Sequence, residues 1–260
     1  MASSVMRIGC WNVNSLKVRL DHLAQFLQAH PIEVLALQET KTVDEQFPVE
    51  AITQLGYQVL FHGQKTYNGV AILSRTPARE LQRGIPGFTD PQARVLTALI
   101  DNLVVVNVYV PNGQTVGSDK YQYKLAFLQA LNSYVQTLLS QYPQVVVLGD
   151  FNIAPDDRDV HDPKAWEGEV LVSAAERQAL TQLMALGLTD VFRIFEQKPH
   201  SFSWWDYRGA RFDRNAGLRI DLILASQALG SHCQGCEVIV TPRTWERPSD
   251  HTPVVARFSR

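Results

Sequence analysis

The sequence predicts an α/β protein with mixed β-sheets, because two kinds of connection join its apolar strands. Some strands are separated by a helical segment, as in parallel βαβ units, and others by a short polar turn, as in antiparallel hairpins. The 260 residues are 45% hydrophobic and 19% charged, which is typical of globular proteins. No linker, low-complexity tract or block of like charge divides the sequence. We therefore expect a single domain over residues 1–260.

Three helices are expected, and each has a recognisable boundary in the sequence. Ser15 is a candidate N-cap of the first helix, which Pro31 ends. Leucine and phenylalanine recur there at helical spacing, and apolar residues keep the same period over residues 121–142. Ser173 and Glu176 form a capping box at the start of the third helix.

The expected strands are short runs of β-branched, leucine and aromatic residues bounded by turn signals. They cover residues 7–11, 33–38, 57–61, 70–74, 95–100, 103–110, 145–148, 218–224, 238–241 and 253–258. Asn68-Gly69 and Asp101-Asn102 are the turn signals of two hairpins. Residues 154–172 are acidic, and we expect them to be irregular.

Polar side chains stand at the ends of several apolar strands. The strand over residues 145–148 stops at Gly149 and presents Asp150 and Asn152, which alternation places on the same side. Taken alone, these two residues suit an Asx turn as well as a catalytic pair. Similar groups at other strands are Asn12, Glu39, Tyr109, Asp221, Asp250 and His251. Because carboxylates rarely interrupt apolar strands, and ligand sites in α/β proteins gather at strand ends, we expect one shared site rather than separate solvated edge residues.

Six segments in this sequence resemble the exonuclease III and apurinic endonuclease family of DNA repair. In chain order they are residues 11–16 (WNVNSL), 37–41 (LQETK), 107–113 (NVYVPNG), 149–152 (GDFN), 217–221 (GLRID) and 249–253 (SDHTP). The resemblance covers essentially the whole chain, and the six motifs together are specific although none is decisive alone. It implies a four-layered α/β/β/α sandwich with two packed mixed β-sheets.

The resemblance also implies a divalent metal ion, Mg²⁺, for which Mn²⁺ can substitute. Hydrolysis of a phosphodiester needs an activated water, a clamp on the phosphoryl oxygens and help for the leaving oxygen. The implied metal ligands are Asn12, Glu39, Asp150, Asn152 and Asp250. Glu39 is the strongest of these for a hard cation, whereas Asn12 could either ligate the ion or orient Glu39. Asn14 stands where some family members carry an aspartate, so the site has one fewer negative charge.

The catalytic residues implied by the resemblance are Asp150, Asn152, Tyr109, Asp221 and His251. Asp150 would manage the proton of the water or of the leaving oxygen, and Asn152 would orient the reacting group. His251 would contact a phosphate oxygen, with Asp221 bonded to its other nitrogen. Tyr109 would donate to the phosphate or to the leaving oxygen. Whether Asp150 or His251 activates the water is left open by the sequence.

Binding to DNA requires local cations, because the net charge of the chain is −2. Basic and aromatic residues are interleaved in the 200–219 loop, at Trp204, Trp205, Tyr207, Arg208, Arg211, Arg214 and Arg219. Further candidate contacts are Lys65, Tyr67, Asn68, Arg94, Asn112, Lys120 and Lys124. By resemblance, Trp204, Leu218 and Ile220 line a pocket for a flipped-out abasic deoxyribose. An ordinary surface loop with packed aromatic residues is the alternative interpretation.

The remaining features point to a protein of the cytoplasm. Cys10, Cys233 and Cys236 suit a reducing compartment, and the last two offer too few ligands for structural zinc even with the adjacent histidine. Residues 1–5 show no secretory signal, and no apolar run is long enough to span a bilayer. We expect a monomer without a membrane partner, associated with the nucleoid if the source is a bacterium.

The favoured hypothesis is a Mg²⁺-dependent DNA repair nuclease acting on double-stranded DNA with abasic sites or blocked 3′ ends. It would cut 5′ to abasic sites and also show 3′→5′ exonuclease or 3′-phosphatase activity. One alternative keeps the fold and the metal chemistry but hydrolyses a small-molecule or lipid phosphoester. Another is a catalytically silent DNA-binding module. The 200–219 loop favours DNA, and the complete set of polar strand ends favours an enzyme.

Overall fold

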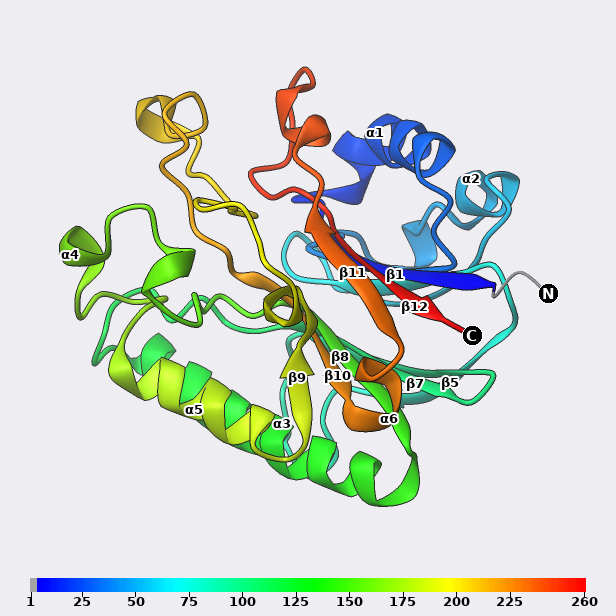
Figure 1. Cartoon of the computed structure of the whole chain (residues 1–260). Coiled ribbons are helices and arrows are strands. Elements are labelled where there is room, and N and C mark those ends of the chain that lie inside the picture. The colour runs from blue at the N-terminus through cyan, green and yellow to red at the C-terminus, as the bar shows by residue number, and fades with distance from the viewer. Residues whose placement is uncertain (1–3) are drawn as a thin grey trace.

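A computed structural model describes residues 4–260, which form four layers (Figure 1). In this part of the chain, two six-stranded mixed sheets pack face to face. Helices α1 (Leu16–Ala29) and α2 (Val49–Gln54) cover the outer face of one sheet. Helices α3 (Asp119–Gln141) and α5 (Ala174–Met184) cover the outer face of the other. The predicted α/β/β/α sandwich is confirmed.

The two sheets have the same internal plan. The first contains, in spatial order, β11 (Cys233–Val238), β12 (Val254–Ser259), β1 (Val5–Asn12), β2 (Val34–Gln38), β4 (Val70–Ser74) and β3 (Gln58–His62). The second contains β5 (Ala78–Arg83), β6 (Val95–Ile100), β7 (Leu103–Tyr109), β8 (Gln144–Asp150), β10 (Asp221–Ser226) and β9 (Leu188–Asp190). The pairs β1–β2 and β7–β8 are parallel and are bridged by α1 and α3, as expected for βαβ units.

Short helical segments complete the chain. They are α4 (Pro163–Trp166), α6 (Gln227–Gly230) and 3₁₀ turns at Asp44–Gln46, Asp157–Asp159, Val191–Ile194, Arg208–Ala210 and Thr241–Thr244. Within residues 4–260, none of the helices has the length and apolar character that crossing a membrane requires. Residues 1–3, on which part of the signal-peptide expectation rests, lie outside the described range.

Alternation along β8 shows how the layers are held together. Val146 and Leu148 lie in the core between the sheets, whereas Val145 and Val147 lie in the core against α3 and α5. The strand is buried on both faces, which explains its continuous apolar run. The same alternation turns Asp150, two residues beyond Leu148, toward the space between the sheets.

The helix boundaries agree with the capping signals. The Ser15 hydroxyl accepts a hydrogen bond from the backbone of Val18 at the start of α1. Ser173 and Glu176 form the predicted reciprocal capping box of α5. These side chains satisfy N–H groups that the first turn of a helix leaves without an intrahelical partner.

The expected strand over residues 218–224 begins later than predicted. β10 starts at Asp221, and Leu218 instead forms an isolated bridge with Trp204. The side chain of Arg219 turns into a buried cluster of acidic residues, which takes this segment out of the sheet. Asp221 is therefore the first residue of its strand rather than an internal one.

The prediction of a strand over residues 238–241 is wrong. β11 ends at Val238, and a 3₁₀ turn begins at Thr241. β11 is an edge strand with a register shift between Cys233 and Gly235. A polar edge strand with a bulge has no clear alternation, so its sequence gives little signal.

Several short elements were not predicted. Helix α2 and strands β5 and β9 are short, and β5 has a mostly polar sequence with partly exposed residues. The acidic segment 154–172 is not wholly irregular, because it contains a 3₁₀ turn and α4. These elements gain their order from packing on neighbours rather than from a strong local pattern.

Candidate active site

Side chains from several strands meet at one edge of the sandwich. Asn12, Tyr109 and Asp150 are the last residues of β1, β7 and β8. β10 runs antiparallel to β8, so its first residue, Asp221, pairs directly with Asp150. His251 lies just before β12, which is antiparallel to β1. Polar groups that are far apart in the sequence therefore reach the same place.

Asp150 is buried and is held by two hydrogen bonds. Its Oδ1 accepts one of 2.9 Å from the backbone N–H of Asn152, and its Oδ2 accepts one of 2.9 Å from the amide of Asn12. Burial raises the pKa of Asp150 to about 7, with the charge of His251 opposing this shift and that of Asp221 adding to it. A carboxyl group with such a pKa can take up and release a proton near neutral pH, as general acid–base catalysis requires.

His251 is fixed by a carboxylate on its far side. Its Nδ1 lies 2.9 Å from Oδ2 of Asp221, which also accepts a 2.7 Å hydrogen bond from the hydroxyl of Ser203. Burial alone would lower the pKa of His251, but the carboxylates of Asp221 and Asp150 raise it well above its usual value. Because Nε2 lies 3.5 Å from Asp150 Oδ2, beyond ordinary hydrogen-bond length, its proton is available to another acceptor.

Asn12 orients two carboxylates at once. Its amide nitrogen donates to Oε2 of Glu39 at 2.5 Å as well as to Asp150. Its amide oxygen accepts the backbone N–H of Asn14 at 3.0 Å. Of the two roles that the sequence allowed for Asn12, this geometry favours the orientation of Glu39. Lys41 stands on the other side of Glu39, with 3.7 Å between Nζ and Oε1.

Glu39 and Asp150 fit a hard divalent cation. Ligand atoms of Glu39, Asp150 and His251 all lie within 4.8 Å of one another. Oxygen ligands of this kind suit Mg²⁺, whereas a protonated imidazole has no lone pair to offer. Asp250 lies outside this group, and its Oδ2 accepts a 3.1 Å hydrogen bond from the ring N–H of Trp204. The acidic part of the cluster is therefore the part that can hold a metal ion.

Asn152 is held in a left-handed conformation, with φ of 49°. Its N–H closes an Asx turn onto Asp150, and its side-chain amide donates to the carbonyl of Val110 at 2.8 Å. The buried Lys124 donates to its backbone oxygen at 2.6 Å. The Asx turn considered from the sequence is present, and it holds the two polar residues in place.

Tyr109 borders a cavity of about 560 Å³. Side chains around this cavity include Tyr67, Asn68, Arg94, Asn112, Lys120 and Tyr123. The guanidinium of Arg94 lies over the Tyr109 ring, 4.7 Å from its centroid. Burial and the carboxylates of Glu39 and Asp150 raise the pKa of Tyr109 well above its usual value, so its hydroxyl stays a donor. The cavity brings several predicted substrate contacts beside the site, and Lys65 is exposed in the preceding loop.

Trp204, Leu218 and Ile220 lie together in one apolar cluster. Trp204 is half-buried and forms isolated β-bridges with His251 and Leu218. Leu218 and Ile220 are 0% and 1% exposed and pack with residues such as Leu171. The structure thus places all three beside His251, two of them as buried side chains.

Three of the expected DNA contacts are buried instead. Arg219 is 1% exposed, and its guanidinium pairs with Asp159 at 2.7 Å and with Asp190 at 2.6 Å. Lys124 and Trp205 are 0% and 1% exposed. The sequence shows that a residue is basic or aromatic, but it does not show that the fold buries the side chain. The predictions that these three residues contact DNA were therefore wrong.

Arg208 differs from the buried arginine in the same loop. Its side chain is 90% exposed and pairs with Asp206 at 2.7 Å. Lys120, in the first turn of α3, is also exposed. These cations are free to meet a polyanion, and Asp206 would compete with phosphate for Arg208.

Ser203 is a buried part of the site that the sequence did not reveal. Its hydroxyl donates to Asp221 and accepts the backbone N–H groups of Ile220 and Asp221, both at 3.1 Å. It therefore fixes the start of β10 and the carboxylate that orients His251. A lone serine beside aromatic residues carries no recognisable signal in a single sequence.

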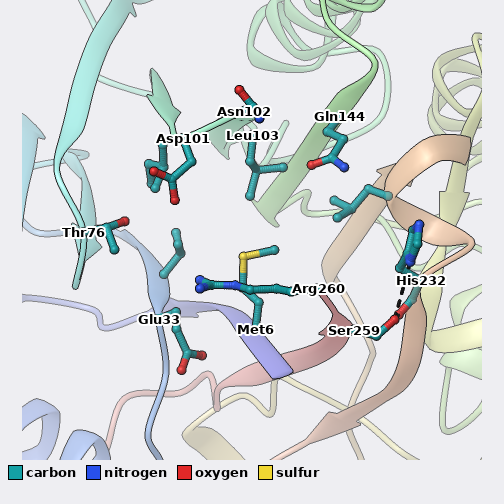
Figure 2. A pocket seen from close by; sticks show the side chains of 13 residues that line it. Met6, Glu33, Thr76, Asp101, Asn102, Leu103, Gln144, His232, Ser259 and Arg260 are labelled. Atoms are coloured by element: carbon teal, nitrogen blue, oxygen red, sulfur yellow. Dashed lines mark hydrogen bonds between the residues drawn. The ribbon is translucent and has the colours of Figure 1, made fainter. Parts of the chain in front are cut away.

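A second pocket lies at the opposite end of the sandwich (Figure 2). Its volume is about 280 Å³, and its lining includes Met6 near the start of β1, Gln144 at the start of β8, and Arg260. The catalytic candidates stand at the other ends of these two strands. This pocket is therefore separate from the candidate active site.

Comparison with known proteins places this site in a family. The chain matches the endonuclease/exonuclease/phosphatase family over residues 9–251. Exodeoxyribonuclease III of Haemophilus influenzae is 35% identical to it, over 97% of this chain and 100% of that protein. A Neisseria structure, described as a 3′-phosphatase bound to product DNA hairpin, is 42% identical with a TM-score of 0.96, and covers 98% of this chain and 100% of its own.

A structure described as an AP endonuclease from Archaeoglobus fulgidus is 35% identical, with a TM-score of 0.93. The match covers 97% of this chain and 99% of that one. The matched range runs from β1 to His251 and so includes every strand end that meets at the site. The chain belongs to the endonuclease/exonuclease/phosphatase family and is a nuclease similar to exonuclease III and the AP endonucleases.

Proposed function

We propose that the protein hydrolyses phosphoester bonds of damaged double-stranded DNA, 5′ to abasic sites and at blocked 3′ ends. The observation that carries this proposal is the position of Asp150. This buried carboxyl group lies beside a protonated imidazole and within reach of the Glu39 carboxylate. Such a set combines a proton acceptor, a cationic donor and a metal ligand, as hydrolysis of a phosphodiester requires.

Asp150 is the group that activates the water. The carboxylates of Asp221 and Asp150 raise the pKa of His251, which favours the protonated ring and makes it a donor rather than the acceptor of the water proton. Asp150, with a pKa of about 7, is present partly as a carboxylate under the same conditions. His251 Nε2 then donates to a phosphoryl oxygen, and Tyr109 donates to the phosphate or to the leaving oxygen. Asn152 orients the reacting group.

Glu39 and Asp150 would hold a Mg²⁺ ion at this site, and Mn²⁺ could replace it. When bound, a divalent ion supplies positive charge that stabilises the phosphoryl oxygens and lowers the pKa of a bound water. Asn12 keeps both carboxylates aimed at the same point. Asn152 and Asp250 are further candidate ligands.

DNA lies across the edge of the sandwich where the site opens. Cationic and aromatic side chains around the cavity beside Tyr109 suit phosphate contacts and stacking, and Arg208 extends this surface. The half-buried Trp204 would meet the abasic sugar, with the buried Leu218 and Ile220 packed behind it. The descriptions of the Neisseria and Archaeoglobus relatives support action at 3′ phosphates and at abasic sites.

The protein works as one domain and as a monomer in the cytoplasm, near the nucleoid if the source is a bacterium. Bacterial exodeoxyribonuclease relatives and three free cysteines support this setting. The small-molecule phosphoesterase alternative keeps the same metal chemistry, and the silent DNA-binding alternative keeps only the cationic surface. The favoured function and these two alternatives predict different results when the protein is offered DNA and other phosphoesters.

The test offers the purified protein three duplexes: one with an abasic analogue, one with a recessed 3′-phosphate, and one intact. Each is incubated with Mg²⁺, with Mn²⁺ and with EDTA. We expect metal-dependent hydrolysis of the first two, faster than digestion of the intact end. Hydrolysis of an inositol phosphate or a lipid phosphoester, with no action on DNA, would support the first alternative. Tight DNA binding without any hydrolysis would support the second.

A further inference from the structure

Lys124 extends from α3 into the protein beneath the active site, with no exposed surface. Its ammonium donates to the backbone oxygens of Asn152 at 2.6 Å and of Asn112 at 3.1 Å, and it pairs with the carboxylate of Glu176. These acceptors match the three N–H groups of an ammonium. Burial lowers the pKa of Lys124, and the charge of Glu176 opposes that shift.

Stability alone does not account for a lysine at this position. A buried ion pair contributes little to stability compared with well-packed apolar residues of similar volume. An apolar side chain would nevertheless leave two carbonyl oxygens, from two different loops, facing one another without a donor. Asn112 lies in the loop that follows β7, and Asn152 lies in the loop that follows β8. The lysine bridges these two loops from below, in addition to the hydrogen bond from the Asn152 side chain to Val110.

We propose that Lys124 is a positioning residue that sets the distance between the loop carrying Asn112 and the loop carrying Asn152. Asn112 borders the cavity beside Tyr109, and Asn152 lies next to Asp150. The ammonium thereby aligns the surface that receives DNA with the group that acts on the phosphate. This role rests on the proposed DNA hydrolysis and adds a residue to it that does not touch substrate.

The first loop is fitted closely to the lysine stem. Gly113 has φ of 89°, and a Cβ placed on it would lie 3.0 Å from Cδ of Lys124. A side chain at this position would therefore be strained and would also press on the lysine. Contact along the stem and a hydrogen bond at the ammonium fix this loop at two points.

Glu176 gives the ammonium a rigid anchor. Its carboxylate accepts the backbone N–H of Leu171 at 3.0 Å and that of Ser173 at 3.2 Å, within the capping box of α5. The anchor therefore belongs to α5, a helix that packs on α3. Because Asn152 acts at the reacting phosphate, displacement of its loop should affect kcat more than KM.

The test replaces the charged pair without leaving a buried charge. The double variant Lys124→Met, Glu176→Gln keeps an acceptor for the N–H groups of Leu171 and Ser173. Turnover of the recessed 3′-phosphate duplex is measured in Mg²⁺, below the Tm of each variant as followed by circular dichroism. We expect a folded protein whose kcat falls about 100-fold, whose KM changes much less, and whose pH profile keeps its shape.

Two matched controls separate positioning from stability. Glu176→Gln alone keeps both carbonyl contacts of Lys124 but weakens the anchor of its ammonium, so its kcat should fall less than that of the double variant. Tyr121→Phe removes a 2.7 Å hydrogen bond to Ser173 in the same helix interface and keeps the ring that lies beside Gly113. It should lower Tm and leave kcat unchanged.

A folded double variant with wild-type kcat and KM would overturn the proposal and leave the pair a structural one. If the double variant fails to fold, Lys124→Gln with Glu176→Gln replaces it, and its single amide donor should restore part of kcat. Failure of both to fold, while Glu176→Gln folds, would also overturn the positioning role in favour of a folding role. Absence of hydrolysis by the wild-type protein on every duplex would instead contradict the proposed function.

Discussion

Nδ1 of His251 lies 2.9 Å from Oδ2 of Asp221, while Nε2 of the same ring lies 3.5 Å from Oδ2 of Asp150. One carboxylate binds the imidazole, and the other stands just beyond hydrogen-bond reach. The ring is thereby oriented by Asp221 and kept positive by both residues. Its Nε2 proton is therefore available to another acceptor, such as a phosphoryl oxygen.

The substitution Asp221→Asn should weaken His251 as a proton donor without unfolding the protein. The amide preserves the shape of the side chain but removes the charge that raises the pKa of His251. We expect kcat on a recessed 3′-phosphate duplex to fall about 100-fold or more, as when one preorganised donor to a developing charge is lost. Steady-state kinetics and circular dichroism check this result. A variant with unchanged kcat would show that His251 does not need Asp221.

The charge of His251 predicts a pH dependence in the metal-free protein. Its pKa is raised above the unfolded value of about 6.5, so its contribution to stability is fully present below that pH and is lost as pH rises through the folded pKa. NMR titration of the ring in EDTA should show a proton retained above pH 6.5. In Asp221→Asn the ring should titrate at a lower pH than in wild type. A wild-type ring that is neutral at pH 7 would contradict this assignment.

Glu39→Gln should weaken the metal site selectively. Loss of one of two carboxylates reduces the attraction for a hard divalent ion, while the amide keeps the size of the side chain. We expect the Mg²⁺ concentration for half-maximal activity to rise about tenfold or more. Asp250→Asn should raise that concentration less, because this carboxylate accepts from the Trp204 ring and lies outside the acidic cluster. An equal effect of both substitutions would contradict the assignment of Glu39.

Substitutions of Arg219 and Arg208 should have different effects, the first on stability and the second on DNA binding. Arg219→Met leaves Asp190 without a cation and Asp159 with Arg193 alone, and should lower the free energy of unfolding by about 3–5 kcal/mol. Arg208→Ala changes an exposed side chain and should leave unfolding in urea unaltered, while it weakens DNA binding most at low salt. The reverse pattern would contradict the roles given to these two arginines.

The sequence predicts the catalytic residues of this protein better than the residues that hold them in place. Asp150, Asp221 and His251 are visible because charged or polar residues interrupt or end apolar strands, and strand order then brings them together. The supporting roles of Ser203 and Lys124 could not be predicted, because a serine among aromatic residues and a lysine in a helix usually lie on the surface. Their partners lie 12 to 52 positions away in the chain, and only the fold reveals them.

The same limit explains the errors in the fold. β11 is an edge strand with a bulge, and β9 has three residues, so neither carries a periodic pattern of useful length. Arg219 reads as a DNA contact from its neighbours in sequence, but the fold supplies two buried carboxylates. Hydrophobic periodicity shows which face of a helix or strand is apolar. It does not show which polar groups form hydrogen bonds or ion pairs in the fold.

The most direct test of the central claim is the turnover of Asp150→Asn in Mg²⁺. The amide keeps the size of the side chain and one of its two accepting oxygens, but it cannot accept the proton of a water. We expect a folded protein, checked by circular dichroism, and a kcat lower by about 10²–10⁴-fold on both the abasic and the 3′-phosphate duplex. Hydrolysis of either duplex at a near wild-type rate would show that Asp150 is not the catalytic proton acceptor.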